Sequence, residues 1–443
     1  MRAYGALSVL FLSALPVSAL ASGYGLREYS VDAMGMAYAG AAASDGDASY
    51  LAYNPASLAG VVDSDAAINF IGVFPHSDAS YSTALTAAGT PAGGSAHPSN
   101  FVDNAYIPAM GFRTRLSDRW ALGLSVSAPW GLSTDYPTTW AGRYYALKTQ
   151  LFTLNATPTV SYQVTPHLAL AAGMQVEYAW GTLSSAIDFG TLGAMFSIPG
   201  SIPGAFDGRG TFEANDWGYG FVLGAQARLS DSATLGVSYR SSISHTLEGP
   251  LRFRLDAAGI GAAINGATGL FANTHAKTDL DTPDVVSAGL RLRLAEAWTG
   301  FLGADWTNWS RFQALKVDAV NPAQPTEVTT AKWEDSWFVA LGAEYAADEH
   351  WTFRAGTAYD DTPDTNATRE PRIPDNGRFW LAAGATYHAS ETCDVKVAYA
   401  HLFLRDARIS LSPADPANAL RGTLAGTSSV SANVVGVALS LRM

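Results

Sequence analysis

The sequence has little charge, almost no cysteine and no long apolar segment beyond its first residues. Only 15% of its 443 residues are charged, whereas soluble domains carry about a quarter. The single cysteine, Cys393, excludes a framework of disulfide bonds. No run of about twenty apolar residues follows the N-terminus, which excludes membrane-spanning helices.

The sequence also lacks the motifs of enzymes and of cofactor sites. It contains no G-x-S-x-G, no H-E-x-x-H and no phosphate-binding loop. Its eight histidines are scattered without metal-ligand spacing. We therefore expect no catalytic residue, no metal and no cofactor. The net charge of −12 argues against nucleic acid as a partner, and the lack of a nucleotide site means that any transport would be passive.

The composition that remains is mildly apolar and rich in glycine and aromatic residues. The chain has 42 glycines, 19 tyrosines and 12 tryptophans, and its mean hydropathy is +0.06. A transmembrane β-barrel combines these properties, because apolar and polar residues alternate along its strands. The alternative on composition alone is a secreted array of β-sandwiches or a propeller.

The first residues predict a signal for export, and the residues that follow predict a small segment inserted into a barrel. Arg2, an apolar stretch over 7–20 and the small residues of Ala19-Leu20-Ala21 predict a signal peptide over residues 1–21. Residues 22–62 are rich in glycine and alanine, and we interpret them as a hatch that plugs a barrel lumen. Pro55 disfavours helical geometry at the preceding residue, so Asn54-Pro55-Ala56 predicts a turn. On its own this motif is also compatible with an ordinary turn.

From residue 63 to 443 the apolar residues recur with a period of two. Between 168 and 180, for example, Leu170 and Met174 fall on one face, and Gln175 and Glu177 on the other. We count about fourteen such segments of about ten residues, the length of a tilted strand that crosses a bilayer. Strands of a soluble sandwich are usually about half as long. The pattern predicts a 14-stranded antiparallel outer-membrane β-barrel with a small N-terminal α-helical hatch in its lumen.

Connections between these segments alternate between short turns and long loops. Among the long ones are 131–149 and 183–213, and the second carries the apolar Met195 and Phe196. An exposed apolar loop favours ligand contact, although these side chains could equally pack the loop into a cap. Because side chains alternate between the two faces of a strand, the pattern places four charged residues on the inward face. We expect them to form an ion-pair network that holds the hatch: Glu344, Arg354, Asp360 and Arg378.

Tryptophans near the strand ends predict the interfacial girdle of a membrane protein. Nine positions are assigned to this girdle: Trp120, Trp180, Trp217, Trp298, Trp306, Trp309, Trp333, Trp337 and Trp351.

Several of these motifs together resemble the FadL/TodX outer-membrane transport family over nearly the whole chain except the loops. The resemblance rests on Ser22-Gly23-Tyr24-Gly25-Leu26, on Gly35-Met36-Ala37-Tyr38-Ala39-Gly40 and on Asn54-Pro55-Ala56. It continues with Ala128-Pro129-Trp130-Gly131-Leu132, with Asn308-Trp309-Ser310-Arg311-Phe312 and with the run from Trp351 through Ile373-Pro374-Asp375 to Arg378-Phe379-Trp380.

The resemblance implies a route for a hydrophobic substrate. Loops 131–149 and 183–213 would capture it, and a lumen pocket near Ser22-Gly23-Tyr24 would bind it. It would then leave sideways at a kink in the third strand, which maps to Pro129-Trp130-Gly131. Of the two basic residues that the family places in this pocket, Lys316 fits one, whereas Trp180 or Gly181 holds the position of the other.

The kink also follows from the residues themselves. Proline cannot donate a ladder hydrogen bond, and glycine within a strand often marks a bend. An unpaired edge in a bilayer is costly and is tolerated where it is covered or lines a cavity. The alternative is that Pro129 and Gly131 mark the end of a strand at the extracellular rim.

The function that we expect is passive transport of long-chain fatty acids or similar hydrophobic molecules across a bacterial outer membrane. Aromatic or aliphatic hydrocarbons are alternative substrates by the same route. A sealed structural protein or surface adhesin is the alternative of a different class. The expected surroundings are outer-membrane lipid and lipopolysaccharide, and the expected state is a monomer.

Overall fold

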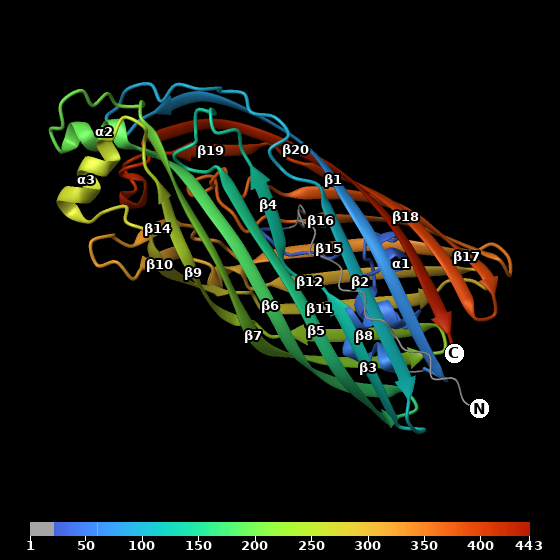
Figure 1. The fold of residues 1–443 in the computed structure, drawn as a ribbon. Helices are drawn as coiled ribbons and strands as arrows, with labels where there is room; N and C mark the ends of the chain where they lie inside the picture. The colour runs from blue at the N-terminus through green and yellow to red at the C-terminus, as the bar shows by residue number, and fades with distance from the viewer. Residues whose placement is uncertain (1–21, 60) are drawn as a thin grey trace, which may run out of the picture.

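The computed structural model describes residues 22–59 and 61–443, which form a closed antiparallel barrel with a small segment inside it (Figure 1). The predicted signal peptide lies outside the described residues. One sheet contains all twenty strand segments, and β1 pairs with β20 to close it. The segments are β1 (Ser64–Leu85), β2 (Ala105–Arg115), β3 (Trp120–Ser127), β4 (Gly131–Asp135), β5 (Lys148–Thr165), β6 (Leu168–Asp188), β7 (Asp207–Ser230), β8 (Ala233–Arg240), β9 (Ser244–Arg254), β10 (Thr274–Asp281), β11 (Val285–Arg293), β12 (Trp298–Thr307), β13 (Ala314–Ala319), β14 (Glu327–Thr330), β15 (Ser336–Ala346), β16 (Trp351–Asp360), β17 (Arg378–Ser390), β18 (Cys393–Leu404), β19 (Ala407–Leu411) and β20 (Thr423–Arg442).

Twenty segments make fourteen barrel strands, because six strands are interrupted and count twice. The interrupted strands are β3 with β4, β8 with β9, β10 with β11, β12 with β13, β14 with β15 and β18 with β19. In the first two cases both halves pair with the same neighbour, β5 for β3 and β4, and β7 for β8 and β9. The predicted 14-stranded barrel is confirmed.

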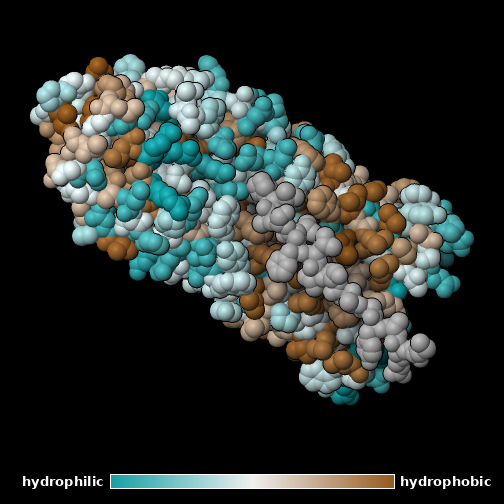
Figure 2. Space-filling model, viewed as in Figure 1, coloured by the Kyte–Doolittle hydropathy of each residue, from teal (hydrophilic) through white to brown (hydrophobic). Residues whose placement is uncertain are grey.

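The strands run further than a bilayer requires. β1 has 22 residues and β7 has 24, so the expected length of about ten residues is too short. Figure 2 shows hydrophobic surface over the half of the barrel nearer the C-terminus, and hydrophilic surface between this band and the end with α2 and α3. The strands therefore continue beyond the apolar band as polar wall. For this reason the expected loop 183–213 contains the ends of β6 and β7.

The segment inside the barrel is built from very short helices. They are α1 (Val31–Met34), η1 (Ala41–Ala43), η2 (Ala48–Ala52) and η3 (Pro55–Leu58). Side chains cap three of their starts, because Ser30, Asp47 and Asn54 each accept a hydrogen bond from a following backbone N–H. These frequent caps and turns divide the hatch into single helical turns, most of them 3-10 turns, within the predicted helical hatch.

The remaining helices lie in connections outside the hatch. They are α2 (Phe189–Met195), α3 (Ile260–Thr268), η4 (Trp309–Arg311) and η5 (Pro416–Asn418). Across residues 22–59 and 61–443, no helix combines the length and the hydropathy needed to cross a membrane.

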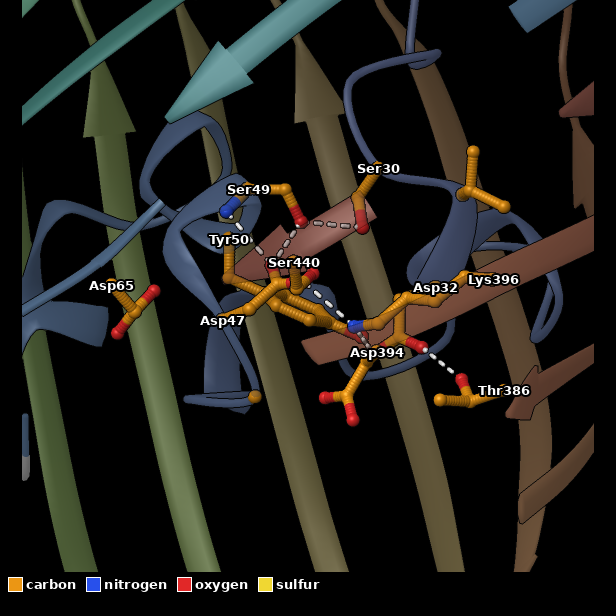
Figure 3. A network of polar contacts seen from close by, with 12 residues as sticks. Ser30, Asp32, Asp47, Ser49, Tyr50, Asp65, Thr386, Asp394, Lys396 and Ser440 are labelled. Atoms are coloured by element: carbon orange, nitrogen blue, oxygen red, sulfur yellow. Dashed lines mark hydrogen bonds and ion pairs between the residues drawn. The ribbon is translucent and has the colours of Figure 1, made fainter. Parts of the chain in front are cut away.

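Buried ion pairs join the hatch to the barrel wall (Figure 3). The Lys396 ammonium on β18 lies 2.6 Å from Asp47 Oδ2 and 3.5 Å from Asp32 Oδ2. Arg354 on β16 lies 2.9 Å from Asp32 and 2.7 Å from Glu344. The predicted network therefore exists for Arg354 and Glu344, and the hatch carboxylate of Asp32 joins it through Arg354.

The other two predicted charges form a second group of ion pairs beside the first. Arg378 is fully buried and lies 2.5 Å from Asp375 and 3.6 Å from Asp360. Arg27 of the hatch pairs with Asp305 and approaches Asp360 to 4.0 Å. Asp360 of β16 thus links Arg27 of the hatch to Arg378 of the barrel wall.

Candidate functional site

The third barrel strand is broken at Pro129. β3 pairs with β2 only from Met110 to Arg115, and β4 pairs with β5 but not with β2. Residues 105–109 of β2 consequently pair with β1 alone. Proline supplies no N–H for the ladder, and the N–H of Trp130 turns to the Thr153 hydroxyl of β5 at 3.0 Å. The expected kink is thus a gap in the hydrogen-bonded wall between the second and third strands.

The chain near the N-terminus covers this gap from the inside. Gly131 N–H donates to the Tyr24 carbonyl at 2.8 Å, and Leu26 N–H donates to the Pro129 carbonyl at 2.8 Å. Gly25 and Trp130 form an antiparallel bridge between these two bonds. Backbone groups that lack a strand partner are therefore satisfied by residues 24–26, which we call the N-terminal segment.

Aromatic rings hold Tyr24 in place. Its ring lies edge-on to Trp309, with centroids 4.6 Å apart, and close to Trp130, Phe312 and Trp333 at 6.0, 5.8 and 5.7 Å. Burial raises the pKa of the Tyr24 hydroxyl, so it stays neutral. The ring cluster fixes the position of the N-terminal segment on the lumen side of the gap.

Gly23 fits this cluster because it has no side chain. Its φ is +62°, and a Cβ there would lie 2.6 Å from the Trp333 ring. Its N–H donates to Asp375 Oδ2 at 3.0 Å, while the Ser22 hydroxyl donates to the Asp361 carbonyl at 2.7 Å. These bonds fix the start of the described chain to the loop between β16 and β17.

Two tryptophans of the expected girdle belong to this cluster instead. Trp309 and Trp333 are 1% and 4% exposed and face Tyr24 inside the barrel, so their assignment to the girdle is wrong. Both lie where the ninth and tenth strands are interrupted. Parity no longer predicts the direction of a side chain there, because the period of two ends with the strand. Trp120 and Trp298 are about half exposed, as a girdle requires.

An apolar cavity of about 80 Å³ adjoins Tyr24. Its lining contains no charged residue and is dominated by aliphatic and aromatic side chains, among them Leu132, Leu151, Leu280 and Phe312. We call this space the Tyr24 cavity. A cavity with such walls suits a hydrocarbon chain, since burial of each CH₂ contributes about 0.8 kcal/mol.

Further cavities lead from the Tyr24 cavity toward the outer loops. A cavity of about 30 Å³, which we call the inner cavity, shares Leu183, Phe212 and Leu315 with it. A larger cavity of about 610 Å³ lies beneath α2 and shares Ser185 and Glu327 with the inner cavity. The three cavities therefore form a continuous series of neighbours between the loops and the N-terminal segment.

A fourth cavity, of about 70 Å³, touches the N-terminal segment and the wall gap together. Gly25, Leu26 and Trp130 contribute to its lining, and Ser22 and Trp309 complete its contact with the aromatic cluster. It shares no lining residue with the Tyr24 cavity. The N-terminal segment therefore lines both spaces and stands between them.

Three of the expected ligand-binding residues lie away from these cavities. Lys316 is exposed on β13, and Met195 and Phe196 at the end of α2 are 65% and 48% exposed. None of the three lines any of the four cavities described. Leu192 from the same loop does line the 610 Å³ cavity, and Gly181 lines the Tyr24 cavity.

The Asn54-Pro55-Ala56 turn anchors the hatch to the wall. The Asn54 amide accepts from Ala56 N–H at 2.9 Å and donates to the carbonyls of Ala42 and Ala225 at 2.6 and 3.2 Å. A Cβ at Gly224 of β7 would lie 2.1 Å from Asn54 Oδ1, so only glycine permits this close approach. Pro55 occupies the first turn of η3, where no N–H is needed.

A second interruption in the wall is filled by side chains. Residues 216–220 of β7 form no ladder with β8 or β9. Ile243 and the fully buried His245 pack there against Gly218, where a Cβ would lie 2.3 Å from Ile243. His245 bonds Glu177 of β6 at 3.1 Å, so this seam is closed by packing. Within residues 22–59 and 61–443, no three metal-ligating side chains converge.

Comparison with known proteins agrees with this architecture. Residues 12–443 match the family described as outer membrane protein transport protein (OMPP1/FadL/TodX). The long-chain fatty acid transport protein of Escherichia coli O6:H1 is 27% identical over 87% of this chain and 88% of its own length. Outer membrane protein P1 of Haemophilus influenzae is 26% identical over 86% of each chain.

Solved structures share the fold. The crystal structure of a Pseudomonas aeruginosa FadL homologue superposes with a TM-score of 0.86 at 24% identity, covering 95% of this chain and 99% of that one. The Pseudomonas putida toluene transporter TodX reaches a TM-score of 0.67 at 17% identity, with coverage of 95% and 99%. With the family match over nearly the whole sequence, these findings show that the chain belongs to the OMPP1/FadL/TodX family of outer-membrane transport proteins, and that it is not an enzyme.

Proposed function

We propose that this protein carries long-chain fatty acids or similar hydrophobic molecules passively into the outer membrane and releases them sideways at Pro129-Trp130-Gly131. The observation that carries the proposal is the double role of the N-terminal segment. Tyr24 lines the apolar cavity, and the backbone of the same segment pairs with the broken third strand. A ligand that displaces Tyr24 would therefore also uncover the gap in the wall.

The first step of the route is capture at the outer loops. The 610 Å³ cavity beneath α2 is lined by Leu192, Phe271 and Leu420, and so offers apolar surface near the polar end of the barrel. Leu192 of the 183–213 loop lines this cavity, which supports the expected role of that loop in capture. Movement inward then follows the series of cavities that share lining residues.

Affinity for the Tyr24 cavity comes from burial of the hydrocarbon tail. A tail of ~14 methylenes would gain roughly 11 kcal/mol before the entropic cost of binding, at about 0.8 kcal/mol per CH₂. An exposed ion pair adds only about 0–1 kcal/mol. Downhill partition from the outer medium into lipid then suffices as the driving force, and no energy source is required.

Release requires the N-terminal segment to leave the gap. Two backbone hydrogen bonds join it to Pro129 and Gly131, and each contributes only about 0.5–1.5 kcal/mol net. Ligand binding beside Tyr24 could offset that amount. The lumen is filled by the hatch, whose ion pairs with the wall oppose exit straight through the base. Sideways release into the bilayer is then the easier path.

The alternative of a sealed structural protein or adhesin requires a lumen without a ligand cavity. The Tyr24 cavity and its neighbours support transport over that alternative. Aromatic or aliphatic hydrocarbons are alternative substrates by the same route. We further propose that the protein acts as a monomer surrounded by outer-membrane lipid and lipopolysaccharide.

A reversible disulfide between Gly25 and Trp130 tests the proposed gate. The hydrogen bonds that flank this pair make it a non-hydrogen-bonded antiparallel pair, whose short Cα separation suits a disulfide. We expect cells that produce the Gly25→Cys, Trp130→Cys protein, in a Cys393→Ala background, to take up fatty acid only after reduction. Uptake of labelled oleate with and without a reductant measures this.

Each single cysteine variant in the same background serves as the control, because it carries the substitution without the crosslink. Its uptake should not respond to the reductant. Equal uptake by the oxidised and the reduced double variant, with the crosslink verified by mass spectrometry, would contradict release through this gap.

A further inference from the structure

Arg372 is a buried cation beside the ligand cavities. It lies in the loop between β16 and β17, is 7% exposed and lines the inner cavity. Its neighbour Ile373 lines the Tyr24 cavity, as does Thr149, which accepts a hydrogen bond from the Arg372 guanidinium at 3.1 Å. The guanidinium therefore lies where the inner cavity meets the uncharged Tyr24 cavity.

The hydrogen bonds of Arg372 leave much of its donor capacity unused. Nη1 donates to the Thr149 hydroxyl and to the Ser184 carbonyl at 3.1 and 3.3 Å. Among the described residues, Nε and Nη2 have no acceptor within hydrogen-bond distance, since Glu370 Oε2 is 3.7 Å from Nε. The Nε–Nη2 edge is one of those on which arginine binds a carboxylate through two parallel hydrogen bonds.

The nearby carboxylate of Glu370 bonds another cation through one oxygen, whereas its Oε2, the oxygen that faces Arg372, forms no hydrogen bond among the described residues. Its Oε1 accepts from Arg421 Nη1 at 2.9 Å, and Arg421 also donates to Glu327 at 2.9 Å. Burial lowers the pKa of Arg372, although Glu370 opposes this effect. Arg372 is thus a buried charge whose nearest carboxylate is shared and too distant for a hydrogen bond.

Other buried cations in the barrel are paired more closely or lie away from the cavities. Lys396 and Arg378 have carboxylate oxygens at 2.6 and 2.5 Å. Arg369 has an equally long ion pair of 3.6 Å to Asp364, but it lines none of the four cavities. Incomplete pairing and contact with a cavity therefore coincide at Arg372.

We propose that Arg372 binds the anionic head group of an amphiphile in the inner cavity, with the hydrocarbon tail in the Tyr24 cavity. This inference rests on the proposed function and specifies its substrate as a carboxylate-bearing molecule instead of a neutral hydrocarbon. Thr149 and the Ser184 carbonyl hold the guanidinium from one side, which leaves the Nε–Nη2 edge for the ligand. Arg372 thereby takes the role that the family resemblance assigned to Lys316, which is exposed on β13.

Comparison of an acid with an alcohol of equal chain length tests the head-group site. We would measure displacement of a neutral fluorescent hydrocarbon probe from purified protein at about pH 8, where the fatty acid is ionised. For Arg372→Gln we expect roughly 10- to 100-fold weaker binding of the fatty acid, the loss expected for hydrogen bonds to a charged group. Binding of the fatty alcohol should change by less than about twofold.

Two further variants separate a binding role from a structural one. Arg372→Lys retains the charge but not the two parallel hydrogen bonds, so its affinity for the acid should lie between those of Arg372→Gln and the wild type. Lys316→Gln removes a cation of the adjoining β13 and should leave both affinities unchanged. Unchanged binding of the acid by Arg372→Gln, or equal loss of acid and alcohol, would overturn the inference.

The same data distinguish this inference from the proposed function. Wild-type protein that binds neither acid nor alcohol would overturn both. Wild-type protein that binds both ligands, with no acid-specific loss in Arg372→Gln, would overturn only the role of Arg372.

Discussion

At the scale of single residues, the lumen depends on charges that have almost no access to water. Lys396 is 5% exposed and forms ion pairs with Asp47 and Asp32. The hydroxyls of Ser49 and Ser440 donate hydrogen bonds to the Asp47 carboxylate. Burial opposes ionisation of Asp47, but the Lys396 ammonium outweighs it and holds the pKa of that carboxyl well below its usual range. A charge in such a site is stabilising only while its partner remains.

We predict that Lys396→Met loosens the hatch. Removal of Lys396 leaves the Asp47 carboxylate buried without its cation, while Asp32 keeps Arg354, and breaking such a buried pair costs about 3–5 kcal/mol. The expected result is faster proteolysis of the hatch and a lower unfolding midpoint in denaturant, measured on purified protein. The control Lys396→Met with Asp47→Asn should recover part of the loss. A single variant as stable as wild type would contradict the role of the pair.

The same pair predicts a dependence of hatch stability on pH. Because the pKa of Asp47 is lower in the folded protein than the ordinary value of about 3.9, the pair stabilises the folded state fully above that value. Its contribution decreases as the pH falls below about 4. The protection factors of the hatch amides against hydrogen exchange should therefore fall at acid pH in wild type, and change less in the Asp47→Asn variant. An equal response in both would contradict this.

At the scale of elements, the second half of the third strand, β4, has a strand ladder on one side only. β4 bonds β5 on one side; on the other side Gly131 bonds Tyr24 of the N-terminal segment, and the rest of β4 bonds residues 101–103. The residues responsible are Pro129, which lacks a donor, and Gly131, whose N–H bonds Tyr24. A strand with β-branched residues there would favour pairing with β2.

We predict that Pro129→Val with Gly131→Val closes the gap. The restored N–H group and β-branched side chains favour a continuous third strand, so fatty acid uptake should fall to the level of cells without the protein. Ligand binding to the purified variant should persist, because the Tyr24 cavity contains neither residue. Uptake equal to wild type would contradict lateral release at this position.

At the scale of the whole molecule, the barrel wall and the segment inside it depend on different parts of the chain. The wall closes through 20 paired positions between β1 and β20, and residues 22–24 contribute nothing to that ladder. These residues do occupy the lumen, where they contact the ring cluster and line two cavities. The fold of the wall and the path through it therefore depend on different parts of the chain.

We predict that deletion of residues 22–24 abolishes uptake without unfolding the barrel. Loss of Tyr24 removes a wall of the Tyr24 cavity and one of the two backbone hydrogen bonds that cover the gap, so high-affinity ligand binding should disappear. Far-ultraviolet circular dichroism should retain the β-sheet signal, and its thermal transition should remain cooperative. A folded variant with normal uptake would refute the assignment of the N-terminal segment to the route.

The sequence alone determined the barrel, because alternation with a period of two is a local property. Each outward side chain faces lipid and each inward one faces the lumen, so strand number and inward charges such as Arg354 and Glu344 could be read from the chain. The kink was predictable for a similar reason, since the missing donor of Pro129 is a property of that residue. The family resemblance added the order of events along the route.

Only the tertiary structure decided which residues surround the cavities. Trp309, Trp333 and Arg372 lie where strands are interrupted or in the loop between β16 and β17, so no periodicity indicates their direction. Tyr24, Thr149 and Arg372 are far apart in the chain and meet only because the barrel closes around the hatch. Contacts between such distant segments depend on how the whole chain packs, and local pattern carries no information about them.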